Sequence, residues 1–127
     1  MKLGVSAVSG NLDAQVDPRF GRCRFFVIVD SETMNFTAVS NAATAAMHGA
    51  GIQAAQMMVN KGVQVVLTGN VGPNAFRTLS AAGIKIVTGI SGTVKDVVEK
   101  YKRGELKEVS SPTVSGHSGM GGGRGRR

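Results

Sequence analysis

Two short apolar segments in the second half of the chain share one pattern, and this pattern restricts the possible folds most strongly. Residues 62–69 read Gly-Val-Gln-Val-Val-Leu-Thr-Gly, and residues 83–89 read Gly-Ile-Lys-Ile-Val-Thr-Gly. In each, a glycine suited to ending a helix precedes a strand-length apolar run, and Thr-Gly marks the end of that strand. Pro73 suits the first turn of a helix that Gly83 ends. The pattern therefore predicts strand–helix–strand, with parallel strands joined by a right-handed crossover.

The first forty residues predict a different arrangement, in which three strands follow one another. Residues 2–8 alternate larger and smaller side chains, and residues 24–30 contain a continuous apolar run typical of a strand covered on both faces. Residues 35–40 follow after a short turn, and short turns join antiparallel neighbours. Together with strands predicted at 63–67 and 84–87, this meander predicts an α/β fold with a mixed five-stranded sheet.

Helices are predicted on both faces of this sheet. They are expected at residues 49–61, at residues 73–82, and from Thr93 to a stop at Gly104. In the first helix Ile52, Ala55 and Val59 fall on one face, which we expect to be buried. Thr93 is expected to cap the third. Residues 41–48 are Ala-rich without a clear period and are interpreted as an extended link.

The 127 residues suffice for one domain with one hydrophobic core, which we place at residues 1–109. Residues 110–127 are rich in Ser, Gly, Pro and Arg. We expect them to be disordered, because their few apolar side chains cannot offset the entropy lost on ordering. Three of the seven net positive charges come from Arg124, Arg126 and Arg127, which leaves +4 for the rest of the chain. With few aromatics, this distribution argues against specific nucleic-acid binding.

The chain contains no apolar run near the ~20 residues that a membrane helix needs, so we expect no membrane association. We also recognise no signal peptide at the N-terminus. Cys23 is the only cysteine and cannot form an internal disulfide. These features predict a cytoplasmic protein.

The loop that precedes the second strand is the first candidate site. It reads Asp-Pro-Arg-Phe-Gly-Arg-Cys over residues 17–23, so that two arginines flank the only thiol. Positive neighbours lower the pKa of a thiol, and the thiolate is the form that binds metals. A free cysteine that simply packs at the start of a strand is the alternative.

Two further segments provide polar groups. Residues 68–74 read Thr-Gly-Asn-Val-Gly-Pro-Asn and connect a strand to a helix, at the edge of the sheet where α/β proteins bind ligands and where helix N–H groups favour anions. A tight turn alone would also use these residue types. His48 precedes Gly49 at the start of the first helix, and a solvated histidine is the alternative to a metal ligand there.

The sequence argues against an enzyme. It contains no CxxC, HExxH or GxSxG motif and no evident carboxylate pair for acid–base chemistry. It also lacks the Walker pattern, since no lysine follows Gly72.

Taken together, these segments resemble the dinitrogenase iron–molybdenum cofactor biosynthesis family, of the NifX and NifB C-terminal-domain type. The resemblance covers roughly residues 1–108. Its most specific part is the run Leu-Thr-Gly-Asn-Val-Gly-Pro-Asn-Ala-Phe at 67–76, and the segments 17–21, 49–55 and 101–106 also fit. It implies a fold similar to a ribonuclease H core. It further implies binding and transfer of an iron–sulfur precursor of the cofactor, with metallocofactor assembly proteins as partners.

From the resemblance we expect a carrier of an iron–sulfur cluster or iron–molybdenum cofactor precursor. Cys23 and His48 are the expected metal ligands. The expected cofactor-binding residues are Asp17, Arg19, Phe20, Gly21, Arg22, Gly49, Gly51, Thr68, Gly69, Asn70, Gly72 and Asn74. A module that binds a small molecule or anion in the same cleft without metal is the first alternative. A hydrolase on a ribonuclease-H-like fold is the second, and the missing carboxylate cluster disfavours it.

Overall fold

The structure, a computed structural model, describes residues 1–45 and 49–113. One five-stranded sheet forms its centre, with the strand order β3-β2-β1-β4-β5. The strands are β1 (Lys2–Ala7), β2 (Phe25–Asp30), β3 (Phe36–Ser40), β4 (Val65–Leu67) and β5 (Lys85–Val87). β2 pairs antiparallel with both β1 and β3, whereas β1, β4 and β5 pair in parallel. The predicted mixed five-stranded sheet is confirmed, while the closer likeness to a ribonuclease H core stays a prediction.

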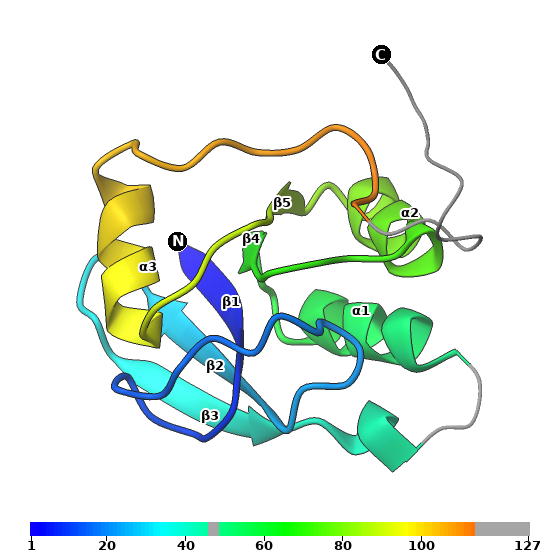
Figure 1. Cartoon of the computed structure of the whole chain (residues 1–127), viewed down its shortest axis with the longest axis horizontal. Coiled ribbons are helices and arrows are strands. Elements are labelled where there is room, and N and C mark those ends of the chain that lie inside the picture. Colours follow the sequence, from blue (N-terminus) through cyan, green and yellow to red (C-terminus); the bar gives the residue numbers. More distant parts are fainter. Residues whose placement is uncertain (46–48, 114–127) are drawn as a thin grey trace.

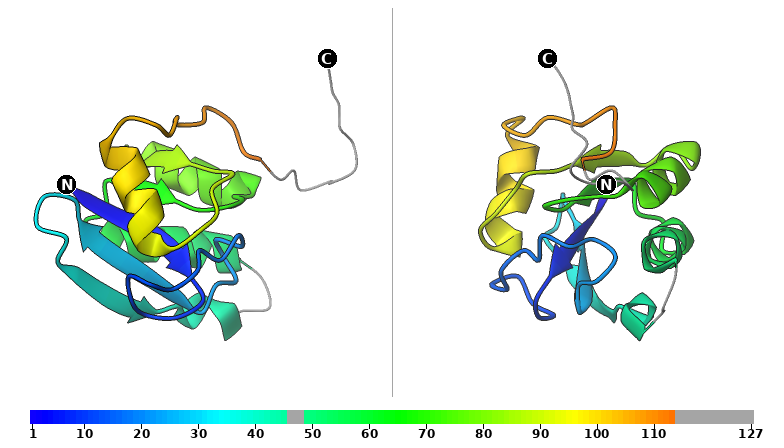
Figure 2. Two further views of the ribbon diagram at one scale, coloured as in Figure 1. Left: turned by 60° about the vertical axis from the view of Figure 1, so that its left-hand side comes forward. Right: turned by 45° about the vertical axis from the view of Figure 1, so that its right-hand side comes forward.

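The helices lie on both faces of this sheet, as predicted. They are α1 (Ala50–Asn60), α2 (Pro73–Ala81) and α3 (Val94–Lys102). Figure 2 shows α3 on one side of the strands and α1 with α2 on the other. None of the helices in the described ranges is long and apolar enough to cross a membrane.

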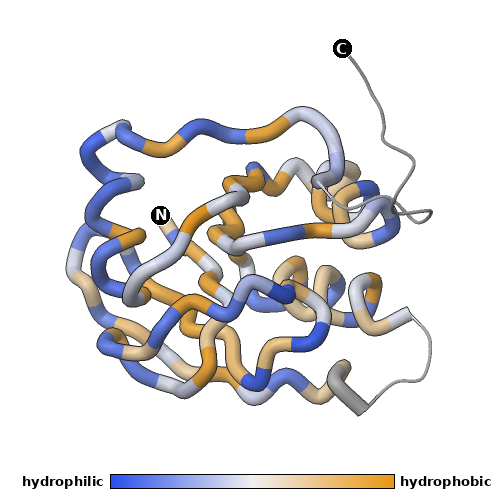
Figure 3. The backbone as a smooth tube through the Cα atoms, in the orientation of Figure 1, coloured by the Kyte–Doolittle hydropathy of each residue, from blue (hydrophilic) through white to orange (hydrophobic). Residues whose placement is uncertain are grey.

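The two faces of the sheet form two apolar layers, because successive side chains of a strand point to opposite sides. On β4, Val66 packs with α1 and α2, whereas Val65 and Leu67 pack on the side of α3. Figure 3 shows the hydrophobic colouring concentrated along the central strands and the hydrophilic colouring along much of α3. The central strands β1, β2 and β4 are therefore buried on both faces, as is usual where helices cover both sides of a sheet, whereas the edge strand β3 is largely exposed.

The predicted inward face of α1 is only partly correct, because Ala55 is buried as expected but Ile52 and Val59 are not. The helix buries Ala54, Ala55 and Met58, whereas Ile52 and Val59 are 39% and 36% exposed. Small side chains on the buried face allow α1 to approach its neighbours closely. The larger β-branched residues are consequently left on the outside.

Residues 41–45, the described part of the predicted extended link, also differ from that prediction, because a short 3₁₀ helix, η1, spans Ala42–Ala45. The Asn41 side chain accepts a hydrogen bond from the Ala43 amide at 3.1 Å and so caps this turn. At α3 the predicted cap is confirmed: the Thr93 hydroxyl accepts a hydrogen bond from the Asp96 amide at 3.1 Å.

Candidate functional site

The site lies where the chain leaves β1 and β4 in opposite directions. These strands are parallel neighbours; the loop after β1 leads to β2 on one side, and the loop after β4 leads through α2 to β5 on the other. Such a reversal opens a crevice at the carboxyl ends of the strands, where open α/β sheets bind ligands. The two loops touch each other: the Asn70 amide donates a hydrogen bond to the Pro18 carbonyl at 2.8 Å.

A pocket of about 480 Å³ opens beside this contact. It lies between residues 19–22 of the first loop, the start of α1 and the start of α2. The lining residues are Arg19, Phe20, Gly21, Arg22, Gly49, Ala50, Gly51, Ile52, Asn70, Gly72, Pro73, Asn74 and Ala75. Its volume lies within the range of small-molecule and cofactor sites. We call it the candidate pocket.

At three glycines around the candidate pocket, the main chain lies so close to a neighbouring segment that an added Cβ atom would be crowded. A Cβ atom on Gly69 would lie 2.5 Å from Pro18 Cα, and one on Gly21 would lie 3.0 Å from Gly51 Cα. A Cβ atom on Gly51 would in turn lie 3.2 Å from the Cβ atom of Ala75. The loop after β1 therefore lies directly against the loop after β4 and the start of α1, and α1 lies against α2.

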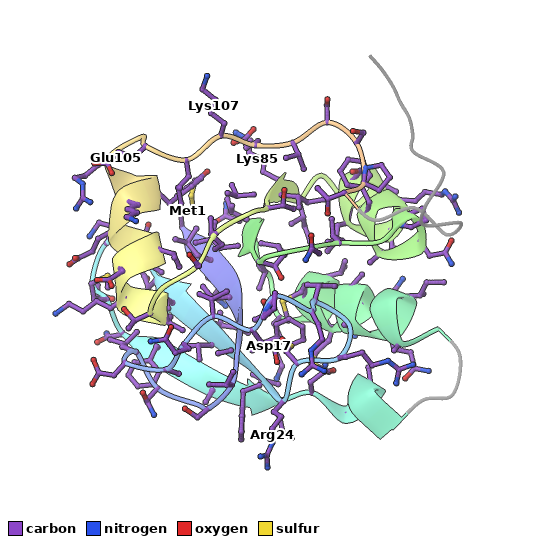
Figure 4. All side chains as sticks on the ribbon, in the orientation of Figure 1. Met1, Asp17, Arg24, Lys85, Glu105 and Lys107 are labelled. Carbon is purple, nitrogen blue, oxygen red and sulfur yellow. The ribbon has the colours of Figure 1, made fainter. Side chains whose placement is uncertain are left out.

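Asp17 supports the first loop from inside, and only 2% of its surface is exposed. Figure 4 shows it near the centre of the molecule. Its carboxylate accepts hydrogen bonds from the Arg19 amide at 2.9 Å and from Arg19 Nε and Nη2 at 3.2 Å each. The hydrogen bond and the charge of Asp17 both raise the pKa of Arg19. Asp17 thus holds the exposed Arg19 side chain at the pocket wall.

Thr68 lies below the loops, fully buried. Its hydroxyl is 2.7 Å from that of Ser6, and the Ser6 hydroxyl donates a hydrogen bond to the Asp17 carbonyl at 2.6 Å. Asp17, Thr68 and Gly69, expected to bind the cofactor, do not line the candidate pocket. They hold the loops that form it.

The charges around the candidate pocket are positive. Gly49 and Gly72 precede α1 and α2, and neither has a side chain that could cap the first-turn N–H groups. These groups and the helix dipole attract anions. Arg19 and Arg22 add guanidinium groups. Moreover, the sequence contains no Asp or Glu between Glu32 and Asp96.

Cys23 is placed differently from the prediction. It has no exposed surface, and its Sγ donates a hydrogen bond to the Phe20 carbonyl at 3.3 Å. Burial, and then the charge of Asp17, raise the pKa of Cys23 to about 12. It does not line the candidate pocket, so its position matches the packing alternative. The expected lowering of the thiol pKa is not found, because burial and the charge of Asp17 outweigh the hydrogen bonds that lower it.

The raised pKa of Cys23 predicts an inert thiol. Near pH 8, alkylation by iodoacetamide should be about a thousandfold slower in the folded protein than for an ordinary cysteine, because almost no thiolate is present. The pKa of Cys23 is higher in the folded protein than in the unfolded chain. The stability that the neutral, buried thiol contributes is therefore fully present below about pH 8.5, and it is lost as the pH rises towards about 12. Mass spectrometry of timed alkylation, with the urea-unfolded protein as control, measures this; equal rates would contradict the placement.

Of the remaining predicted residues, nine line the candidate pocket: Arg19, Phe20, Gly21, Arg22, Gly49, Gly51, Asn70, Gly72 and Asn74. His48 lies outside the described residues. Four lining residues were not among the predicted binding residues, namely Ala50, Ile52, Pro73 and Ala75, although Pro73 belongs to the candidate segment 68–74. Across residues 1–45 and 49–113, no group of three or more His, Cys, Asp or Glu side chains could hold a metal ion.

Comparisons with known proteins agree with this architecture. The chain is 43% identical to the apo form of the orange protein from Desulfovibrio gigas, with a TM-score of 0.86 over 88% of this chain and 95% of that one. It is 37% identical to a NifB-like protein from Thermotoga, with a TM-score of 0.77 over 88% of this chain and 96% of that one. An uncharacterised protein of Methanocaldococcus jannaschii is 29% identical over 74% of this chain and 82% of its own length.

The family comparison matches nearly the whole described domain. The model of the family described as "Dinitrogenase iron-molybdenum cofactor" matches residues 1–104, which include every loop and helix start around the candidate pocket. The resemblance found in the sequence is thereby confirmed, and this chain belongs to the dinitrogenase iron–molybdenum cofactor family.

Proposed function

We propose that the protein binds an anionic iron–sulfur cluster of the iron–molybdenum cofactor precursor type and carries it during cofactor assembly. One observation supports this most: two helix starts without side-chain caps and two arginines border a single pocket. Backbone N–H groups at helix starts bind anions, and guanidinium groups donate charge-assisted hydrogen bonds to them. A sulfide-rich metal cluster is such an anion.

The pocket's composition suits a cluster that arrives with its own ligands. Its described walls offer main-chain N–H groups, amides and arginines, and no set of protein metal ligands. Storage sites for iron–sulfur clusters more often use four cysteines. Weak ligation of the cluster by the protein suits its transfer to a partner. His48 stays our proposed protein ligand for the cluster. The burial of Cys23 supports a packing role for that residue.

Family membership supports a carrier or accessory protein in place of an enzyme, with metallocofactor assembly proteins as partners. The orange protein is described in an apo form, that is, without a bound group, and its similarity supports binding of a group here. We place this activity in the cytoplasm. Binding of a small metal-free anion in the same pocket is the alternative, since helix starts and arginines do not require a metal.

Anaerobic reconstitution with iron and sulfide tests the proposal. The protein, freed of unbound ions, should retain iron and sulfide and absorb visible light. Arg22→Gln should weaken retention about tenfold, because it removes a charged donor. Arg19→Gln should weaken retention as well, because the Arg19 side chain borders the same pocket.

Arg24→Gln is the matched control, because Arg24 is exposed and does not line the candidate pocket. Figure 4 shows its side chain pointing away from the domain. Metal analysis and absorption spectra of the variants measure retention. Equal loss in all three would indicate adsorption to a basic surface. A colourless protein that binds tripolyphosphate would favour the metal-free alternative.

A further inference from the structure

The sheet has two edge strands, and the edge at β5 is covered by the chain itself. Glu108 forms an antiparallel bridge with Val87, and the Val109 amide donates a hydrogen bond to the Ile86 carbonyl at 2.8 Å. An edge covered in this way is closed to a further strand. Residues 114–127, most of the tail predicted to be disordered, lie outside the described residues.

The outer edge of β3 is different. Figure 1 shows β3 along the lower border of the domain. Across residues 1–45 and 49–113, β2 is the only strand that pairs with it, and the register runs without a bulge. The sequence of β3, Phe-Thr-Ala-Val-Ser, contains no charged residue and no proline, and most of it is exposed, with Phe36 at 42%. Charges, prolines and bulges usually protect an edge, so this edge is suited to pairing.

The hydrogen bonds at both ends of β3 show which main-chain groups face this outer edge. The Asp30 amide donates to the Asn35 carbonyl at 2.8 Å, and the Asn41 amide donates to the Arg24 carbonyl at 2.9 Å. In an antiparallel ladder, successive residues direct their N–H and C=O groups to opposite sides. The odd-numbered residues of this segment therefore bond to β2. The even-numbered residues direct their groups away from the sheet, namely Phe36, Ala38 and Ser40.

We propose that β3 pairs antiparallel with β3 of a second copy of this chain, so that the two sheets join into one. The outward-facing residues are spaced evenly about Ala38. In this pairing Ala38 lies opposite Ala38 of the second copy, and Phe36 lies opposite Ser40. Each of these pairs can exchange two main-chain hydrogen bonds, because all of these residues direct their N–H and C=O groups outwards. Such a two-fold contact closes on itself and stops at a dimer.

The charges at the two ends of β3 also fit a second copy. Glu32 is exposed in the turn that precedes the strand, and Arg24 is exposed beside the residue that follows the strand. Antiparallel pairing brings the start of one β3 to the end of the other, so that each Glu32 falls at the same end as Arg24 of the second copy. Parallel pairing would instead bring like charges together. Complementary charges of this kind fix the orientation of partners.

Sedimentation velocity and amide hydrogen exchange test the pairing on the full chain, without any ligand. Between about 5 and about 500 µM, the mass should rise from that of one chain towards that of two, with a dissociation constant on the order of 100 µM, as expected of a small interface. Over the same range, exchange at the amides of Phe36, Ala38 and Ser40 should slow about threefold. The amides of Thr37 and Val39 are the internal control, because β2 already protects them.

Variants at one position separate the outward N–H group from other effects. Ser40→Pro removes this donor from each copy and leaves the hydrogen bonds to β2 in place, and proline is tolerated where an edge N–H faces solvent. It should weaken association about tenfold. Ser40→Ala is the matched control, because it keeps the N–H group, and it should associate within about twofold of the original chain.

Charge reversals give a second test that does not need Ser40→Pro to fold. Arg24→Glu and Glu32→Lys should each weaken association about threefold, although they change the net charge in opposite directions. The double variant should restore association, since opposite charges then meet again at each end. Urea unfolding at low concentration shows whether each variant is folded.

A full chain that stays a single copy up to about 500 µM would overturn the inference and leave the edge of β3 to a strand of another protein. A dimer that folded Ser40→Pro and both charge reversals leave intact would also overturn it, because another surface would then hold the copies together. Neither result would affect the proposed function, because the pairing of β3 needs no ligand and cluster retention is measured separately.

Discussion

Replacing Gly69 by alanine should destabilise the protein by about 2–3 kcal/mol, a typical cost of overpacking a close contact. The new Cβ atom would lie 2.5 Å from Pro18 Cα and 2.6 Å from Pro18 Cβ, and neither can move away as a flexible side chain would. The loop after β1 must then shift. This shift stretches the 2.8 Å hydrogen bond from the Asn70 amide to the Pro18 carbonyl.

Urea unfolding followed by circular dichroism measures this loss. Gly83→Ala is the control, because its Cβ atom would meet nothing within 4 Å, and only the positive φ of 79° opposes it. That strain should cost about 1 kcal/mol. If Gly69→Ala were no more destabilising than Gly83→Ala, the two loops would not be in the contact described. Since the pocket wall moves with the loop, Gly69→Ala should also weaken ligand retention by the folded fraction.

Cys23→Ser should destabilise the protein by about 1–3 kcal/mol without changing cluster retention by the protein that remains folded. The serine hydroxyl would replace a fully buried thiol. A hydroxyl buried without a good partner is costly, and the shorter C–O bond places the oxygen farther from the Phe20 carbonyl than Sγ is. His48→Ala is expected to act in the opposite way, with lower cluster retention and little change in stability.

Both quantities should be measured on both variants, by urea unfolding and by iron content after anaerobic reconstitution. If Cys23→Ser loses the cluster while its stability is unchanged, Cys23 is a ligand and its burial does not hold in the loaded protein. Intact retention in His48→Ala would leave the arginines and the main-chain N–H groups as the binding groups.

The sequence predicted the sheet well, because its strands depend on local patterns. The repeated Gly, apolar run and Thr-Gly placed β4 and β5, and the cap at Thr93 placed α3. The orientation of α1 could not be predicted in the same way. Hydrophobicity alone favours burying Ile52 and Val59, but the helix packs through its small residues, and this depends on the shape of its neighbours.

The site was predicted less completely, for a related reason. Glycine, arginine and asparagine stand out in loops, so Gly21, Arg22 and Asn70 were found. Ala50 and Ala75 also line the pocket, but alanine carries no chemical signal. Conversely, Thr68 is polar and follows a strand, yet it lies in the interior with Ser6. Which residues of a turn face the opening depends on the path of the backbone.

The walls of the candidate pocket are joined through contacts at Gly69, Gly21 and Gly51, which involve main-chain atoms and the Cβ atoms of Pro18 and Ala75. Pocket shape and pocket chemistry are therefore set by separate groups of residues. The partly exposed lining side chains Ile52 and Asn74 can be exchanged without disturbing these contacts. If the candidate pocket binds a ligand as proposed, exchanging these two residues should change its selectivity while the contacts that shape the pocket stay in place.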